Sequence, residues 1–232
     1  MGAECRGSAP DQAVSHARGA RCCSVVTDPH DQFPAGFFSR IDAAADSEFY
    51  VPDRFVTHID DRAIAAVGDL YRHLGLTGRV LDLMSSWVSH FDDPPSELVA
   101  LGMNERELRA NEAASSFVVH DLNADPRLPF DADRFDAATC CVSIDYLVRP
   151  IDVLRDAARV VRSGGLVVAT FSNRCFPTKA IRGWLSTGDE AHCEIVSTYF
   201  ELAAAYTDVR AELCTPPRTL GDPLYAVWAT VA

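Results

Sequence analysis

Residues 127–173, RLPFDADRFDAATCCVSIDYLVRPIDVLRDAARVVRSGGLVVATFSN, decide the fold because strand-like and helix-like patterns alternate within them. The apolar run FDAATCCV at 135–142 predicts a buried strand. A helix is expected to begin at Pro150, since proline suits the first helical position and apolar side chains then recur on one face. The SGG triplet ends this helix, and LVVATF at 166–171 predicts a second buried strand. Strand, helix and strand in succession are typical of a parallel sheet covered by helices.

The same alternation extends upstream of this stretch. Three further strands are expected at 79–84 (RVLDLM), 97–102 (ELVALG) and 116–121 (SFVVHD). A helix is expected between the last two, because Asn104 with Glu107 three residues later forms a helix start, and it ends near Asn111. Another helix precedes the first strand: Thr57-x-x-Asp60 is interpreted as a capping box, and apolar residues follow at helical spacing up to Gly75.

Downstream, residues 177–206 predict a helix in two pieces, broken near residues 186–188. The segments TDVRAELCT (207–215) and PLYAVWATV (223–231) are separated by proline-containing turn sequence. They predict an antiparallel pair of strands at the sheet edge.

The N-terminal part of the chain differs in composition. Residues 1–30 are rich in Gly, Ala, Ser and Arg without periodicity, which predicts a disordered tail and leaves a transit peptide as the alternative. The aromatic-rich segment 33–55 is expected to pack across the domain. We therefore divide the chain into a tail (1–30), an N-terminal lid segment with its helix (31–78) and a Rossmann-like domain (79–232).

Charge and composition restrict the partners. The net charge of −12 argues against a nucleic-acid or anionic-membrane footprint, because both need clustered Lys and Arg. No apolar run approaches the roughly 20 residues that span a bilayer, and a soluble, cytoplasmic protein with a small-molecule substrate is expected. The eight cysteines form no Cys-x-x-Cys pair and are interpreted as free thiols. Cys140 and Cys141 are expected to act as small apolar residues, with a redox pair as the alternative.

Residues 127–173 resemble the second half of class I S-adenosylmethionine-dependent methyltransferases, in the small-molecule, type 11-like group. The resemblance rests on the ordered pattern LPF, FD, L, P, RVV and SGG, and with the upstream strands it covers about residues 57–231. It implies an α/β, Rossmann-like sheet of seven strands, mostly parallel, with helices on both faces and an antiparallel C-terminal strand pair. It also implies S-adenosyl-L-methionine as the cofactor, bound across the carboxyl ends of the first four strands.

The resemblance assigns cofactor contacts position by position. The family has an acid after the first strand, matched by Asp82, and then a glycine-rich turn, whose positions fall in this chain on Met84, Ser86 and Val88. A Cβ disfavours positive φ, so the loop runs differently or the ligand lies further out. The alternative is that SSWVSH is only a structural loop. The family's ribose-binding acid falls on Gly102, so that acceptor is absent unless Asn104 serves.

After the third strand, Asp121 matches the residue that accepts from the adenine amino group, with a turn cap as the alternative role. The cofactor-binding candidates are Asp82, Met84, Ser85, Ser86, Trp87, Gly102, Met103, Asn104, Asp121, Leu122 and Cys141. If Gly102 holds the position of the acid, Gly102→Asp is expected to tighten cofactor binding or leave it unchanged.

Catalysis in this family needs mainly alignment, and a base only when the nucleophile is protonated. His90 and Asp145 are the candidate bases, with a surface loop and a helix cap as their alternatives. The substrate candidates are Tyr50, His58, Tyr146, Asn173 and Phe176. No metal is expected, because His90, Asp92, Asp93 and His120 match no ligand spacing.

Three functions remain open. The first is methylation of a small molecule by direct transfer to a nucleophile. The second is an enzyme of the same fold that uses S-adenosylmethionine for cyclisation or elimination. The third is a non-catalytic binding protein.

Overall fold

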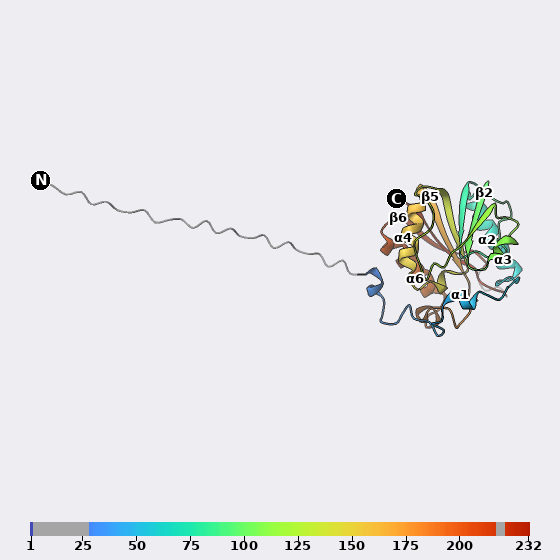
Figure 1. Cartoon of the computed structure of the whole chain (residues 1–232), viewed down its shortest axis with the longest axis horizontal. Helices are drawn as coiled ribbons and strands as arrows, with labels where there is room; N and C mark the ends of the chain where they lie inside the picture. Colours follow the sequence, from blue (N-terminus) through green and yellow to red (C-terminus); the bar gives the residue numbers. More distant parts are fainter. Residues whose placement is uncertain (2–27, 217–220) are drawn as a thin grey trace.

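A seven-stranded sheet forms the centre of the computed structural model, which describes residue 1 and residues 28–216 and 221–232 (Figure 1). Its strands are β1 (Arg79–Leu83), β2 (Glu97–Gly102), β3 (Ser116–Val119), β4 (Phe135–Cys141), β5 (Val161–Phe171), β6 (Tyr206–Leu213) and β7 (Tyr225–Val231). The order across the sheet is β3-β2-β1-β4-β5-β7-β6. The first five strands are parallel, and β7 pairs antiparallel with both β5 and β6. The expected fold class is confirmed.

Helices cover both faces of this sheet, so that β1, β2 and β4 are almost wholly buried. On one face, α4 (Pro150–Val160) and α6 (Asp189–Ala203) pack against inward side chains such as Leu81 and Val167. On the other face, α2 (Asp61–His73) packs against Val80 and Leu98. The alternation of Val80 and Leu81 between the two cores follows from the two-residue period of a strand. The shorter helices are η1 (Pro29–Gln32), α1 (Asp46–Phe49), α3 (Glu105–Arg109), η2 (Ile144–Tyr146) and α5 (Arg182–Leu185).

The aromatic segment before α1 packs on the domain, as expected from its composition. Phe33, Phe37 and Phe38 form mutual ring contacts with centroids 4.8–5.1 Å apart. Phe33 also meets the buried ring of Tyr199 on α6 at 5.5 Å. Gly183 allows this packing, because a Cβ there would overlap with the ring of Phe37.

Three local predictions were wrong. Asp60, not Thr57, caps α2, accepting from the backbone N–H groups of Arg62 and Ala63. β5 begins at Val161, so the glycine pair lies inside the strand, where a bulge against β4 and the close carbonyl of Asp136 leave no room for a Cβ at Gly165. Residues 177–181 are not helical, because Ile181 pairs with Arg40 in an antiparallel bridge.

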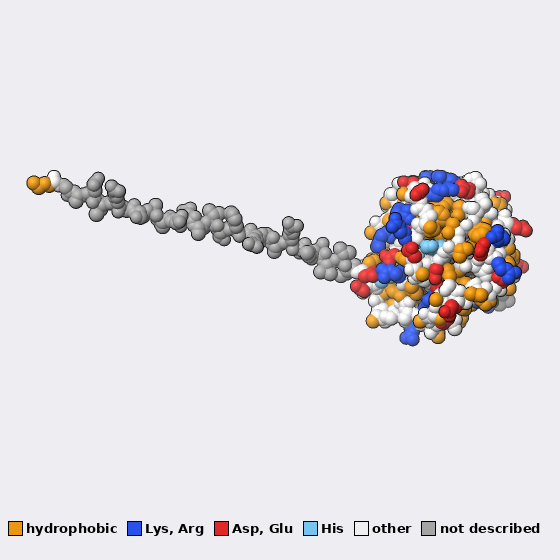
Figure 2. Space-filling model, in the orientation of Figure 1, with side chains coloured by type: hydrophobic (Ala, Val, Ile, Leu, Met, Phe, Trp, Pro, Cys, Tyr) orange, Lys and Arg blue, Asp and Glu red, His pale blue; other side chains and the backbone are white. Residues whose placement is uncertain are grey.

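The predicted tail at 1–30 lies mostly outside the described residues. The cysteines that are described, from Cys140 to Cys214, are free thiols. In the part of the chain that the structure describes, no helix is long and apolar enough to cross a membrane. On the face shown in Figure 2, acidic and basic side chains are interspersed, without one large patch of a single sign.

Candidate active site

A cavity of about 250 Å³ opens at the carboxyl ends of the parallel strands. Its walls are the loops that follow β1 to β5, together with residues from the 46–58 segment. The chain winds from β1 toward β3 on one side and continues from β4 on the other, so the cavity lies at the point where the strand order reverses. Open α/β sheets bind their ligands at this position.

The structure brings most of the predicted site residues together on this cavity. The residues on its wall are Tyr50, His58, Asp82, Met84, Ser85, Ser86, Trp87, His90, Gly102, Met103, Asn104, Asp121, Leu122, Cys141, Tyr146 and Phe176. Two candidates are not on the wall: Asn173 is exposed outside it, and Asp145 is buried beneath it.

The loop after β1 adopts a left-handed backbone without glycine. Met84, at the first glycine position of the family pattern, has φ 53°, and His90 at the loop's end also has φ 53°. Non-glycine residues seldom adopt this region, so tertiary contacts must hold it. One such contact is the backbone N–H of Ser85, which donates to the carbonyl of Leu101 at 2.8 Å. The loop thereby folds back onto β2.

Asp82 supports this loop from below. Its carboxylate accepts from the hydroxyls of Ser85 (2.7 Å), Ser89 (2.6 Å) and Thr139 (2.8 Å), and the residue is 2 % exposed. Burial raises the pKa of Asp82, and the three hydroxyls oppose this shift. The carboxylate is therefore committed to fixing the loop, in place of the cofactor contact that the resemblance implies.

Gly102 cannot be replaced by an acid without moving this loop. A Cβ built on Gly102 would overlap with the backbone carbonyl oxygen of Ser85 and would lie 3.1 Å from Leu108 Cδ2. The expectation that Gly102→Asp is tolerated is wrong, because the glycine-free loop occupies the space of the side chain. Asn104 is no substitute acceptor: its Oδ1 caps α3, and its Nδ2 donates to Tyr50 O and Asp53 Oδ1.

Glu107 supplies a carboxylate that sequence reasoning took only for a capping residue. It lines the cavity and is 7 % exposed. Its Oε1 accepts from the backbone N–H of Arg54 and its Oε2 from the hydroxyl of Ser86, each at 2.6 Å. A buried carboxylate of this kind joins three parts of the wall: the loop after β1, α3 and the lid segment. The only signal in the sequence was an acid three residues after a helix cap.

Asp121 lines the cavity and also caps a turn. Its Oδ1 accepts from the backbone N–H groups of Asn123 (2.9 Å) and Ala124 (3.1 Å), which is the turn-cap alternative. Asn123 then ties the turn to the lid: its Nδ2 donates to Asp46 Oδ2 at 2.7 Å, and its Oδ1 accepts from the backbone N–H of Val148.

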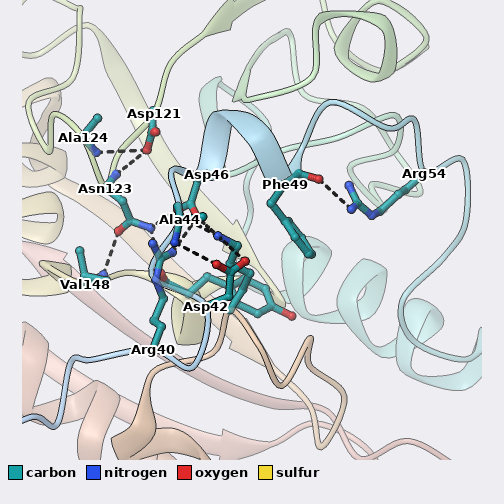
Figure 3. A network of polar contacts seen from close by, with 12 residues as sticks. Arg40, Asp42, Ala44, Asp46, Phe49, Arg54, Asp121, Asn123, Ala124 and Val148 are labelled. Carbon is teal, nitrogen blue, oxygen red and sulfur yellow. Dashed lines mark hydrogen bonds and ion pairs between the residues drawn. The ribbon is translucent and has the colours of Figure 1, made fainter.

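Asp46 holds the lid segment on the cavity (Figure 3). The residue is 6 % exposed, and Arg40 Nη1 lies 2.8 Å from both carboxylate oxygens. Lys179, fully buried, adds an ion pair at 3.1 Å. Burial alone would raise the pKa of Asp46, but the bonds from Arg40, Asn123 and Lys179 outweigh it and hold the pKa below its usual value. Asp46 therefore remains an anion surrounded by cations.

Aromatic rings form the wall between the lid and the exit of β5. Phe176 lies at the centre, with ring centroids 5.1–6.0 Å from those of Phe49, His58 and Tyr146. Tyr146 also fixes the backbone, since its hydroxyl oxygen accepts from the N–H of Phe176 at 2.9 Å. Burial lowers the pKa of His58 and of His90, which keeps both rings neutral near pH 7.

The side chain of Trp87 lies on the wall of the cavity and does not fill it. Its indole N–H donates to the carbonyl of Val56 at 3.1 Å, and its ring meets that of Phe55 at 6.2 Å. The indole thus joins the loop after β1 to the lid, and the cavity beside it stays open.

Comparison with known proteins agrees with this geometry. Residues 73–169 match a family described as a methyltransferase domain. No curated protein matches the chain in sequence. A chain of the complex between a methyltransferase activator and a methyltransferase of Haloferax volcanii is similar in structure, with TM-score 0.54 and 12% identity, over 74% of this chain and 90% of that one. An S-adenosylmethionine-dependent methyltransferase of Aquifex aeolicus gives TM-score 0.51 and 14% identity, over 75% of this chain and 95% of that one.

Residues 73–169 thus match a methyltransferase domain, and the sheet has the fold of the S-adenosylmethionine-dependent methyltransferase to which it is similar. S-adenosylmethionine is the cofactor that this domain and fold imply. The residues present fit this group, because the cavity lies over the reversal of strand order and has apolar walls at two of the cofactor-binding candidates, Met103 and Leu122. The polar contacts differ from the family pattern at Asp82 and Gly102.

Proposed function

We propose that the protein transfers a methyl group directly to a nucleophilic atom of a small molecule. The observation that carries the proposal is the cavity at the carboxyl edge of the sheet, part of whose wall is formed by residues of the 46–58 segment. A wall of this kind shields the acceptor from water and aligns it, and these are the main protein contributions in this kind of reaction. An interior hollow with apolar walls suits a small molecule better than a macromolecule.

S-adenosylmethionine supplies an already activated methyl group when bound. The chain's own task is then to orient the acceptor and to take its proton where the nucleophile is protonated. His90 is the proposed base: it lines the cavity, and its lowered pKa leaves the imidazole neutral and able to accept a proton. Asp145, the other candidate, is not suited to this role because it is buried and does not line the cavity.

Glu107 is the proposed acceptor for the ribose hydroxyls, in place of the missing acid at Gly102. It is a carboxylate on the wall beside Ser86 and Asn104, and a carboxylate has lone pairs beyond the two that Arg54 and Ser86 use. Met103 and Leu122 are the proposed contacts of the adenine ring.

Calorimetric titration with S-adenosylhomocysteine and S-adenosylmethionine tests the proposal. Binding in the micromolar range and methyl transfer from labelled cofactor to a small-molecule fraction are the expected results. Absence of heat and of a thermal shift at millimolar ligand would contradict every enzymatic function.

Glu107→Gln tests the proposed contact between Glu107 and the ribose of the cofactor. The charge-assisted bond it removes is worth about 1.5–3 kcal/mol, so the affinity for S-adenosylhomocysteine is expected to fall roughly ten- to a hundred-fold. The 2′-deoxy analogue should lose less, because it lacks one hydroxyl. Equal losses for the two ligands would assign Glu107 a purely structural role through Ser86.

The glycine-free loop favours one second candidate, in which the cofactor is cyclised or cleaved. Incubation of the protein with S-adenosylmethionine alone distinguishes it. Methylthioadenosine or a cyclic product, formed without an acceptor, would support the second candidate over methyl transfer.

A further inference from the structure

Arg54 is a cation on the cavity wall. Its guanidinium donates to the backbone carbonyls of Phe49 (2.8 Å) and Pro52 (3.2 Å). Among the residues that the structure describes, no carboxylate forms an ion pair with it. The other arginine on the wall, Arg174, is paired with Asp222 at 2.7 Å.

The nearby charges do not neutralise Arg54 either. Asp46, the acid of the lid, is already surrounded by Arg40 and Lys179. Glu107 accepts from the backbone N–H of Arg54, but its second oxygen is turned to Ser86. Guanidinium groups retain five N–H donors in a planar fork that matches a carboxylate. The two carbonyl contacts use two of these five donors, and Arg54 lines the cavity.

Aromatic surface accompanies this cation. The guanidinium carbon lies 4.4 Å from the ring centroid of Phe49, 5.8 Å from that of Tyr50 and 5.7 Å from that of Phe176. Cation–π contact with these rings helps to hold the guanidinium, together with its hydrogen bond to the Phe49 carbonyl, which Figure 3 shows. Tyr50, Tyr146 and Phe176 then present flat apolar surface to the same cavity. A fixed cation beside flat rings suits a planar ligand that carries an anion.

We propose that the methyl acceptor is a small aromatic hydroxy acid, whose carboxylate binds Arg54 while its ring packs between Tyr50, Tyr146 and Phe176. This inference rests on the proposed function and names its substrate class. In the reaction the hydroxyl proton passes to His90, the oxygen bonds to the methyl carbon, and the carbon–sulfur bond breaks with its electron pair left on sulfur as a neutral thioether.

The carboxylate of the cofactor's own methionine part is the competing partner for Arg54. Methylthioadenosine lacks that carboxylate, so comparing its affinity with that of S-adenosylhomocysteine separates the two assignments. In Arg54→Gln both affinities should remain within about two-fold of the wild type. A loss for S-adenosylhomocysteine alone would overturn the inference.

Binding of the acceptor is tested on the protein saturated with S-adenosylhomocysteine. Titration with 4-hydroxybenzoate, 4-hydroxycinnamate and their neutral amides is expected to show at least a ten-fold preference for the acids, from the charge-assisted bond. Arg54→Gln should abolish this preference and Arg54→Lys should retain part of it. The backbone N–H that Glu107 accepts from survives both substitutions. Arg162→Gln, in the ion pair with Asp136 at the opposite edge of the sheet, is the matched control and should keep the full preference.

Equal binding of acids and amides, or a preference that survives in Arg54→Gln, would contradict the inference. So would the absence of acid binding to the saturated protein, which leaves the proposed function intact because the cofactor product has bound. Failure of S-adenosylhomocysteine to bind at all would instead overturn the proposed function.

Discussion

Gly102 carries no side chain because the loop after β1 occupies the space that a Cβ would need. In this chain the loop itself contains no glycine, and a glycine is needed instead at the end of the neighbouring strand, β2. The loop keeps its left-handed turn at Met84 and is held by Ser85 and the buried Asp82. A small residue on β2 and hydroxyl groups in the loop thus replace a glycine-rich turn.

Gly102→Ala is expected to destabilise the fold by about 1–3 kcal/mol, because overpacking against a backbone carbonyl must displace the loop. Thermal unfolding measures this effect, and the affinity for S-adenosylhomocysteine should fall with it. Gly188→Ala is the control, since an added Cβ there meets nothing within 4 Å. An unchanged melting temperature in Gly102→Ala would mean that the loop is not packed against β2.

Helices and strands that a local sequence signal marks were predicted correctly, whereas a segment whose structure depends on distant contacts was not. The apolar run of β2 and the Asn104 cap of α3 are found where the sequence predicts them, because both signals are local. The segment 177–181 follows a helical pattern but pairs with Arg40 from far away in the chain. A distant partner of this kind leaves no mark in a local pattern.

For the candidate site, the sequence predicted the position of the residues but not their hydrogen-bond partners. The fold rule correctly brings the residues after the strands to one cavity. The hydrogen bonds that each polar side chain makes depend on its nearest partners, however: Asp82 binds hydroxyls of the loop after β1, and one oxygen of Asp121 caps a turn. The sequence pattern also could not indicate that the Glu107 side chain lines the cavity and binds Ser86, because an acid at this position is typical of a capping box.

The lid segment is the element whose attachment is most easily weakened. Asp46→Asn removes the anion between Arg40, 9 % exposed, and Lys179, fully buried, and breaking a buried pair typically costs about 3–5 kcal/mol. A lower melting temperature and faster proteolysis within residues 33–56 are expected. Asp42→Asn, a matched change on a half-exposed partner of Lys179, should have a much smaller effect. Similar losses in the two variants would show that Asp46 does not anchor the lid.

For the whole molecule, two acids, the buried Asp145 and the partly exposed Asp136, give opposite trends of stability with pH. Burial raises the pKa of Asp145 to about 8, and its Oδ2 has no hydrogen-bond partner among the residues that the structure describes. The backbone N–H of Arg79 and the guanidinium of Arg162 lower the pKa of Asp136 to about 2. A group that binds its proton more tightly when folded loses stability as pH rises, and one that binds it less tightly gains stability.

Asp145→Asn is therefore expected to be more stable than the wild type at pH 8. Between about pH 4 and 8 the folded protein holds the Asp145 proton that the unfolded chain has released, so the wild type declines as pH rises, by an amount on the order of a few kcal/mol. The difference between the variant and the wild type, measured by denaturant unfolding, should be small near pH 4 and grow toward pH 8. Asp136→Asn is the control of opposite sign: its loss of stability should develop between about pH 2 and 4 and stay constant above. If the difference in free energy of unfolding between Asp145→Asn and the wild type does not change from pH 4 to 8, then Asp145 is ionised in the folded protein. Its pKa would then not be raised by burial.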